Sequence, residues 1–162
     1  MIKKAFTLIE LIIFMGIFSI LIFVLTDIFI ISLKTKTSAE STAVINQDGR
    51  FIFAKLAADI NNANSISSPA LGTSSSTLDI ILYGVPETIS LNSSTGNIEL
   101  TAGGNTYVLN SVNSQITNLT FTRLGNDDVD SKNTIKIDLE LHSRQIVNNT
   151  EIINLRTTVG LR

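Results

Sequence analysis

The chain has 162 residues, of which 44% are hydrophobic and 16% are charged, and this length and composition suit one folded domain plus an apolar segment. The formal net charge of −2 argues against a general nucleic-acid binder, which would carry a basic face, so we predict no direct nucleic-acid binding. The sequence contains no cysteine, which excludes disulfides, zinc–thiolate sites and thiol catalysis. The domain must therefore be held together by packing.

A long apolar stretch extends from Ala5 to Leu33. It has no charged side chain between Leu11 and Leu25, and apolar residues resume after Asp27. Because a bilayer core of about 30 Å requires about 20 mostly apolar helical residues, this stretch predicts a membrane-spanning helix. In a helix that begins near Phe6, Asp27 would lie about 30 Å along the axis, close to the far membrane interface.

One carboxylate, that of Glu10, lies at the entry of this apolar stretch. An ionised side chain well inside a bilayer costs about 2.5 to 3.5 kcal/mol, so such a group is normally paired or functional. We therefore expect a partner that neutralises Glu10.

The residues Lys3-Lys4-Ala5-Phe6-Thr7-Leu8-Ile9-Glu10-Leu11 resemble the class III signal of type IV pilins and pseudopilins. In that family a short basic leader precedes a small residue, usually Gly, followed by Phe-Thr-Leu-Ile-Glu and an apolar helix. The resemblance implies that residues 1–5 are a leader, that prepilin peptidase cleaves between Ala5 and Phe6, and that the new amine of Phe6 is methylated. It also implies that Glu10 faces the N-terminal amine of a neighbouring subunit as a fibre assembles.

Two other interpretations of the N-terminus are a cleaved secretory signal and a plain signal anchor. A secretory apolar region is about 7 to 15 residues long and ends at a small-residue cleavage site, whereas this run is longer and Thr37-Ser38-Ala39 is a weak cleavage candidate. The plain anchor stays as the alternative, although it assigns no role to Phe6 or Glu10. Lysines flank the stretch equally, so the expected location follows from the resemblance: the bacterial inner membrane, single-pass, N-terminus inside.

The helical pattern continues beyond the assembly segment, residues 6–33, into residues 34–63. Apolar or small residues recur there at steps of three and four, at Ile45, Gly49, Ile52, Leu56, Ile60 and Ala63. We place Gln47, Asp48, Arg50, Lys55 and Asp59 on the opposite, polar face. With no proline between Phe6 and Ser68, we predict one helix from Phe6 to about Asn62, roughly 85 Å long at 1.5 Å per residue. A plain anchor would end in a flexible linker soon after Leu33, so the continuation favours the pilin architecture.

Residues 64–77 are rich in Ser, Thr, Gly and Pro, which predicts a loop. Short apolar runs follow and indicate a meander of strands at 78–83, 87–91, 98–102 and 106–109, with Gly84-Val85-Pro86 ending the first. Further strands at 116–124, 134–142 and 151–159 should form an antiparallel sheet against the apolar helix stripe. The predicted fold class is therefore α+β, with a long helical spine packed on an antiparallel β domain of residues 78–162, as in type IV pilins.

Two short segments extend the resemblance. The run Leu56, Asp59, Ile60 and Ala63 resembles the L-x-x-D-[IL]-x-x-A pattern of PilW-like minor pilins and J-type pseudopilins, and residues 156–162 resemble the closing strand of that group. This implies a minor, non-catalytic subunit of a pilus, a secretion pseudopilus or a DNA-uptake fibre. The implied partners are other pilins or pseudopilins in a hetero-oligomeric fibre, prepilin peptidase, the inner-membrane platform protein and membrane lipid.

Few residues suggest chemistry. Asp127, Asp128 and Asp130 cluster between Gly125 and Asn133, and clustered carboxylates can bind Ca²⁺, but their spacing is not that of an EF-hand, so we favour a solvated turn. His142, the single histidine, is predicted on the wet face of a strand with no nucleophile to serve. We predict no catalytic residue, no cofactor and no metal.

Overall fold

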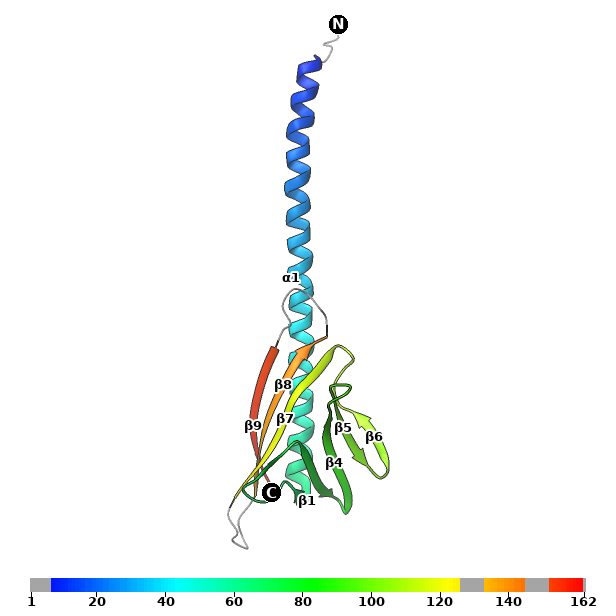
Figure 1. The fold of residues 1–162 in the computed structure, drawn as a ribbon, viewed down its shortest axis with the longest axis vertical. Coiled ribbons are helices and arrows are strands. Elements are labelled where there is room, and N and C mark those ends of the chain that lie inside the picture. The colour runs from blue at the N-terminus through cyan, green and yellow to red at the C-terminus, as the bar shows by residue number, and fades with distance from the viewer. Residues whose placement is uncertain (1–6, 126–132, 145–151, 162) are drawn as a thin grey trace. The chain divides into compact units, whose positions relative to one another are not determined.

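The computed structural model describes residues 7–125, 133–144 and 152–161. Within them the chain forms one helix, α1 (Leu8–Asn62), followed by nine strands in two antiparallel sheets (Figure 1). The predicted α+β fold class is confirmed, and the long helix ends at Asn62 as expected. The chain divides into two compact units, Met1–Ala39 and Glu40–Arg162, and α1 contributes to both.

The part of α1 in the first unit exposes its apolar side chains all round. Large hydrophobic residues between Leu8 and Leu33 are between 43% and 78% exposed, which is typical of a helix surrounded by lipid or by other chains. The hydroxyls of Ser19 and Thr26 donate to carbonyls four residues back, both at 2.8 Å. Those polar groups are thus satisfied inside the helix without water.

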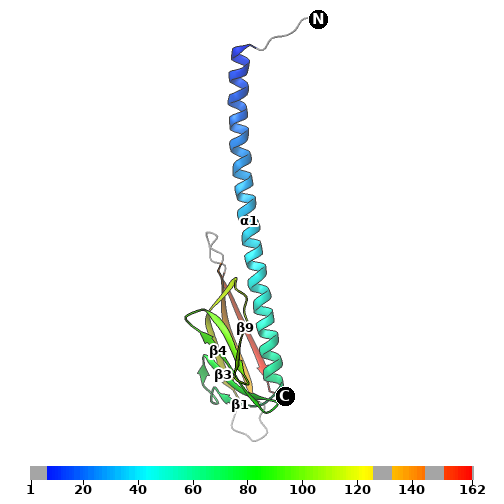
Figure 2. The ribbon, with the colours of Figure 1, turned by 90° about the vertical axis from the view of Figure 1, so that its right-hand side faces the viewer.

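The part of α1 in the second unit buries one stripe. Ile45, Ile52, Leu56 and Ile60 are completely buried, as the sequence spacing predicted. The last three join a single core cluster with inward-facing residues of both sheets, including Ile80, Ile89, Phe121, Ile137 and Leu141. Figure 2 shows α1 lying along the strands of this unit. Burial of these side chains holds the helix to the sheets.

The first sheet has the order β1-β3-β4-β5-β6. Its strands are β1 (Ala63–Ser68), β3 (Thr77–Leu82), β4 (Val85–Asn92), β5 (Asn97–Ala102) and β6 (Asn105–Val108). The β3–β4 hairpin turns on Tyr83 (φ 51°) and Gly84 (φ 80°), and both have the positive φ that a tight type I′ turn requires. The predicted meander is confirmed.

The second sheet has the order β2-β7-β8-β9, with β2 (Ser74–Ser75), β7 (Ser114–Leu124), β8 (Thr134–Ser143) and β9 (Ile152–Gly160). The alternation predicted over residues 134–142 is confirmed in β8, since the apolar residues there are buried and the polar residues are partly exposed on the other face. This sheet is the predicted three-stranded one, extended by the short strand β2.

Three predictions are corrected. Residues 64–77, predicted as a loop, include most of β1 and all of β2, because main-chain pairing with β3 and the buried Ile66 override the weak strand preference of Asn and Ser. The first predicted strand does end before Gly84, but Val85 and Pro86 already belong to β4: Pro86 opposes Ile81, before pairing with β5 begins at Glu87, where a missing N–H is tolerated. Asp59, predicted on the polar face of the helix, is 4% exposed and packs inside.

Candidate functional site

The N-terminal end of α1 carries the residue with the clearest functional prediction. Leu8 begins the helix, so Thr7 is the capping residue and Glu10 is the third helical residue. The Glu10 amide donates to Thr7 Oγ1 at 3.4 Å, and the Leu11 amide donates to the Thr7 carbonyl at 3.2 Å. The Thr-x-x-Glu spacing is that of a capping box, in which the first side chain caps the helix and the Glu can reach back to the capping residue.

This local arrangement gives Glu10 a role that the sequence analysis missed, although Thr7-Leu8-Ile9-Glu10 carries the signal. A carboxylate in the first turn is favoured by the helix dipole, typically by about 0.3 to 1 kcal/mol. The Glu10 side chain is also exposed, and among the described residues no ion pair involves it. It is therefore accessible to a cation from another molecule. The predicted cleavage residues Ala5 and Phe6 lie outside the described residues.

Helix α1 is long and apolar enough to cross a membrane, judged by its length and composition. Glu10 and Asp27 are separated by 17 positions, which is about 26 Å of helix axis at 1.5 Å per residue. The two acidic side chains therefore bracket a segment close to the thickness of a bilayer core. Asp27 is exposed on the helix surface.

In the second unit, a carboxylate of α1 binds the connection between β6 and β7. Asp48 Oδ2 accepts hydrogen bonds from the Ser111 amide at 3.0 Å, from Ser111 Oγ at 2.7 Å and from Ser114 Oγ. The side chain of Asn110 continues this network: its Nδ2 donates to the Ser114 carbonyl at 3.1 Å, and its Oδ1 accepts from the Ile98 amide at 2.9 Å. The network ties the helix to both sheets, which is a structural role.

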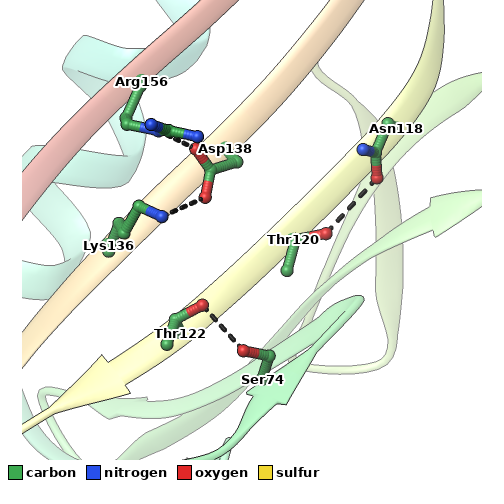
Figure 3. A network of polar contacts seen from close by, with 7 residues as sticks. All are labelled: Ser74, Asn118, Thr120, Thr122, Lys136, Asp138 and Arg156. Carbon is green, nitrogen blue, oxygen red and sulfur yellow. Dashed lines mark hydrogen bonds and ion pairs between the residues drawn. The ribbon is translucent and has the colours of Figure 1, made fainter.

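The outer face of the second sheet carries a ladder of polar side chains (Figure 3). Asp138 on β8 accepts from Arg156 on β9 and from Lys136 at 2.9 Å, and the hydrogen bond from Arg156 lowers the pKa of Asp138. His142 lies on the same face as predicted, with Nε2 2.7 Å from Glu140 Oε1, a contact that lowers the pKa of Glu140. A groove of about 400 Å³ on this sheet is lined by residues of β7, β8 and β9: Asn118, Asp138, Leu139, Glu140, Asn154, Leu155 and Arg156.

The described residues contain no group of three or more His, Asp or Glu side chains able to hold a metal ion. The acidic residues considered for calcium, Asp127, Asp128 and Asp130, lie outside the described residues. Comparison of the chain with models of protein families, with curated proteins and with solved structures finds no match. The features of the chain that indicate a function are therefore the N-terminal segment and the continuity of α1.

Proposed function

We propose that this protein is a minor pilin or pseudopilin, a non-catalytic subunit that prepilin peptidase cleaves between Ala5 and Phe6. It then assembles from the inner membrane into a type IV pilus or pseudopilus on the extracytoplasmic side. The observation that carries the proposal is the joint presence of the pilin-like N-terminal sequence and of one helix, Leu8–Asn62, that leads from the apolar segment into the folded domain.

In this mechanism the Glu10 carboxylate selects the incoming subunit. Cleavage creates an amine on Phe6, and the Glu10 carboxylate of a neighbouring subunit pairs with it. In the apolar environment around α1, an unpaired carboxylate and an unpaired ammonium are both costly, so their pairing favours association. The exposed apolar side chains from Leu8 to Leu33 then pack against equivalent helices of other subunits. The partners of the protein in this mechanism are other pilins or pseudopilins, prepilin peptidase and the membrane platform protein.

The second candidate is a membrane-tethered extracytoplasmic domain, with a binding or enzymatic role, that uses α1 only as an anchor. The Thr7 cap favours this alternative: the Thr7 side chain accepts from the Glu10 amide, and a Glu at this position of a capping box supports the helix end without any neighbouring subunit. The two candidates differ in what they require at position 10. Capping is served by Glu or Gln, whereas pairing with an amine requires the negative charge.

Glu10→Gln therefore separates the two candidates. If the proposal holds, this variant should be inserted and cleaved as the wild type is but should be lost from sheared fibres. The measurement is an immunoblot of the membrane and sheared-fibre fractions of the native host. Thr7→Val is the matched control. It removes the capping hydroxyl, which costs about 1 kcal/mol of helix stability, but keeps the negative charge of Glu10, so this variant should still enter fibres. Glu10→Gln incorporated at the wild-type level would favour the tethered domain.

A further inference from the structure

Two carboxyl groups of the second unit each have a buried oxygen without a hydrogen-bond partner: Asp59 in the last turns of α1 and Glu87 on β4. Asp59 is 4% exposed, and its Oδ1 accepts from Lys55 Nζ at 2.7 Å. Its other oxygen, Oδ2, is buried and has no hydrogen-bond partner. A buried carboxylate oxygen without a donor is costly, so this arrangement calls for a donor that the ionised side chains do not supply.

Glu87 on β4 lies on the core side of the first sheet, and the charge of Asp59 acts on it. It pairs directly with Ile80 on β3, and Ile80 is 1% exposed in the core. Directly paired residues lie on the same face of a sheet, so the Glu87 side chain lies on the core side, as Ile89 does two residues later. Glu87 Oε2 is likewise buried without a partner.

The charged groups that act on Glu87 all come from α1. Burial raises the pKa of the Glu87 carboxyl above its ordinary value of 4.5, the negative charge of Asp59 raises it further, and Lys55 lowers it. The direct partners of Glu87 on the adjacent strands are Ile80 and Ala102, which do not titrate. The Lys55 ammonium already compensates one oxygen of Asp59, which makes a proton a better fit than a metal cation for the two remaining oxygens.

We propose that Glu87, when it is protonated, donates a hydrogen bond to Asp59 Oδ2, so that this carboxyl pair fastens the end of α1 to β4 in a pH-dependent way. One proton satisfies both orphaned oxygens. Because the pKa of Glu87 is higher in the folded than in the unfolded state, the stabilisation is fully present below pH 4.5 and is lost as the pH rises through the folded-state pKa. Above that range the two adjacent negative charges repel.

The test uses the full chain in detergent micelles and the ¹³C NMR titration of its Glu carboxyl groups, with the Glu87 resonance identified by its absence in Glu87→Gln. Glu87 should titrate above the ordinary Glu value in the wild type, and Asp59→Asn should bring it back toward that value. A Glu87 resonance that titrates at the ordinary value in the wild type overturns the proposal. If Glu87→Gln folds poorly, through-bond assignment of the wild-type spectrum identifies the Glu87 resonance, so the titration still decides the question.

A second readout is the free energy of unfolding across the mildly acidic to neutral range. The stability of the wild type should decline as the pH rises. The side-chain amide in Glu87→Gln donates to Asp59 Oδ2 at every pH, so the stability of this variant should not decline. Glu99→Gln is the control: it makes the same chemical change on β5, on the face that points away from the core, and should keep the wild-type dependence of stability on pH. A Glu87→Gln profile that follows the wild type overturns the proposal.

Discussion

The two parts of α1 are built from one continuous helix but differ in what surrounds them. In the first unit, apolar side chains cover the whole circumference, and none of them is buried. In the second unit, one stripe of the helix, formed by Ile45, Ile52, Leu56 and Ile60, is completely buried, and the last three of these residues pack in a core shared with both sheets. The difference indicates that the second part of the helix is stabilised by its own domain, whereas the first part requires lipid or other chains to cover it.

The largest expected difference between the two parts of α1 comes from the same Ile→Ala substitution made in each of them. Ile52 is completely buried, whereas Ile17 is 64% exposed. Ile52→Ala should lower the free energy of unfolding of the second unit by about 2 to 5 kcal/mol, because it leaves a cavity in the core. Ile17→Ala should change it by less than about 0.5 kcal/mol. Denaturant unfolding in detergent measures both, and equal losses would contradict the distinction between the two parts.

A smaller effect is expected where α1 binds the β6–β7 connection. Asp48→Ala removes the acceptor for three donors from Ser111 and Ser114, so we expect a loss of about 1 to 3 kcal/mol in unfolding free energy. Gln47→Ala is the matched control on the neighbouring, exposed position and should be close to neutral. If the two variants are equally stable, the network does not hold the helix.

The smallest expected effect on unfolding free energy concerns Gly49, one of the two glycines of α1. A Cβ at Gly49 would overlap Leu155 Cδ1, whereas a Cβ at Gly16 has open space around it. Gly49→Ala gains about 1 kcal/mol of helix propensity but forces Leu155 to move, so the full gain should appear only together with Leu155→Ala. A double-mutant cycle measures this coupling. Additive effects would show that Gly49 is not required for close packing of β9.

The sequence predicted what depends on periodicity. The extent of α1 followed from three- and four-residue spacing without proline, and β8 followed from strict alternation between Ile135 and Leu141. It did not predict β1, because Asn and Ser resemble loop residues until β3 supplies a pairing partner.

The sequence also did not predict the environment of two acidic residues of α1. Asp48 and Asp59 are 11 positions apart, close to three turns, so they lie on one side of the helix at the border of the apolar stripe. Helical spacing alone does not indicate whether such a border position meets water or a strand. Ser111, which donates to Asp48, comes from a distant part of the chain, and β4, whose Glu87 is affected by the charge of Asp59, does so too, so only the fold brings them to the helix.

The candidate assembly site was found from its motif, and the capping box at Thr7 is what the structure adds to it. The central claim is that the leader is removed so that Glu10 can pair with a new amine. Intact-mass spectrometry of the protein from membranes that contain active prepilin peptidase tests this most directly. The account predicts a chain that begins at N-methylated Phe6; a chain that still carries Met1 under those conditions would contradict it.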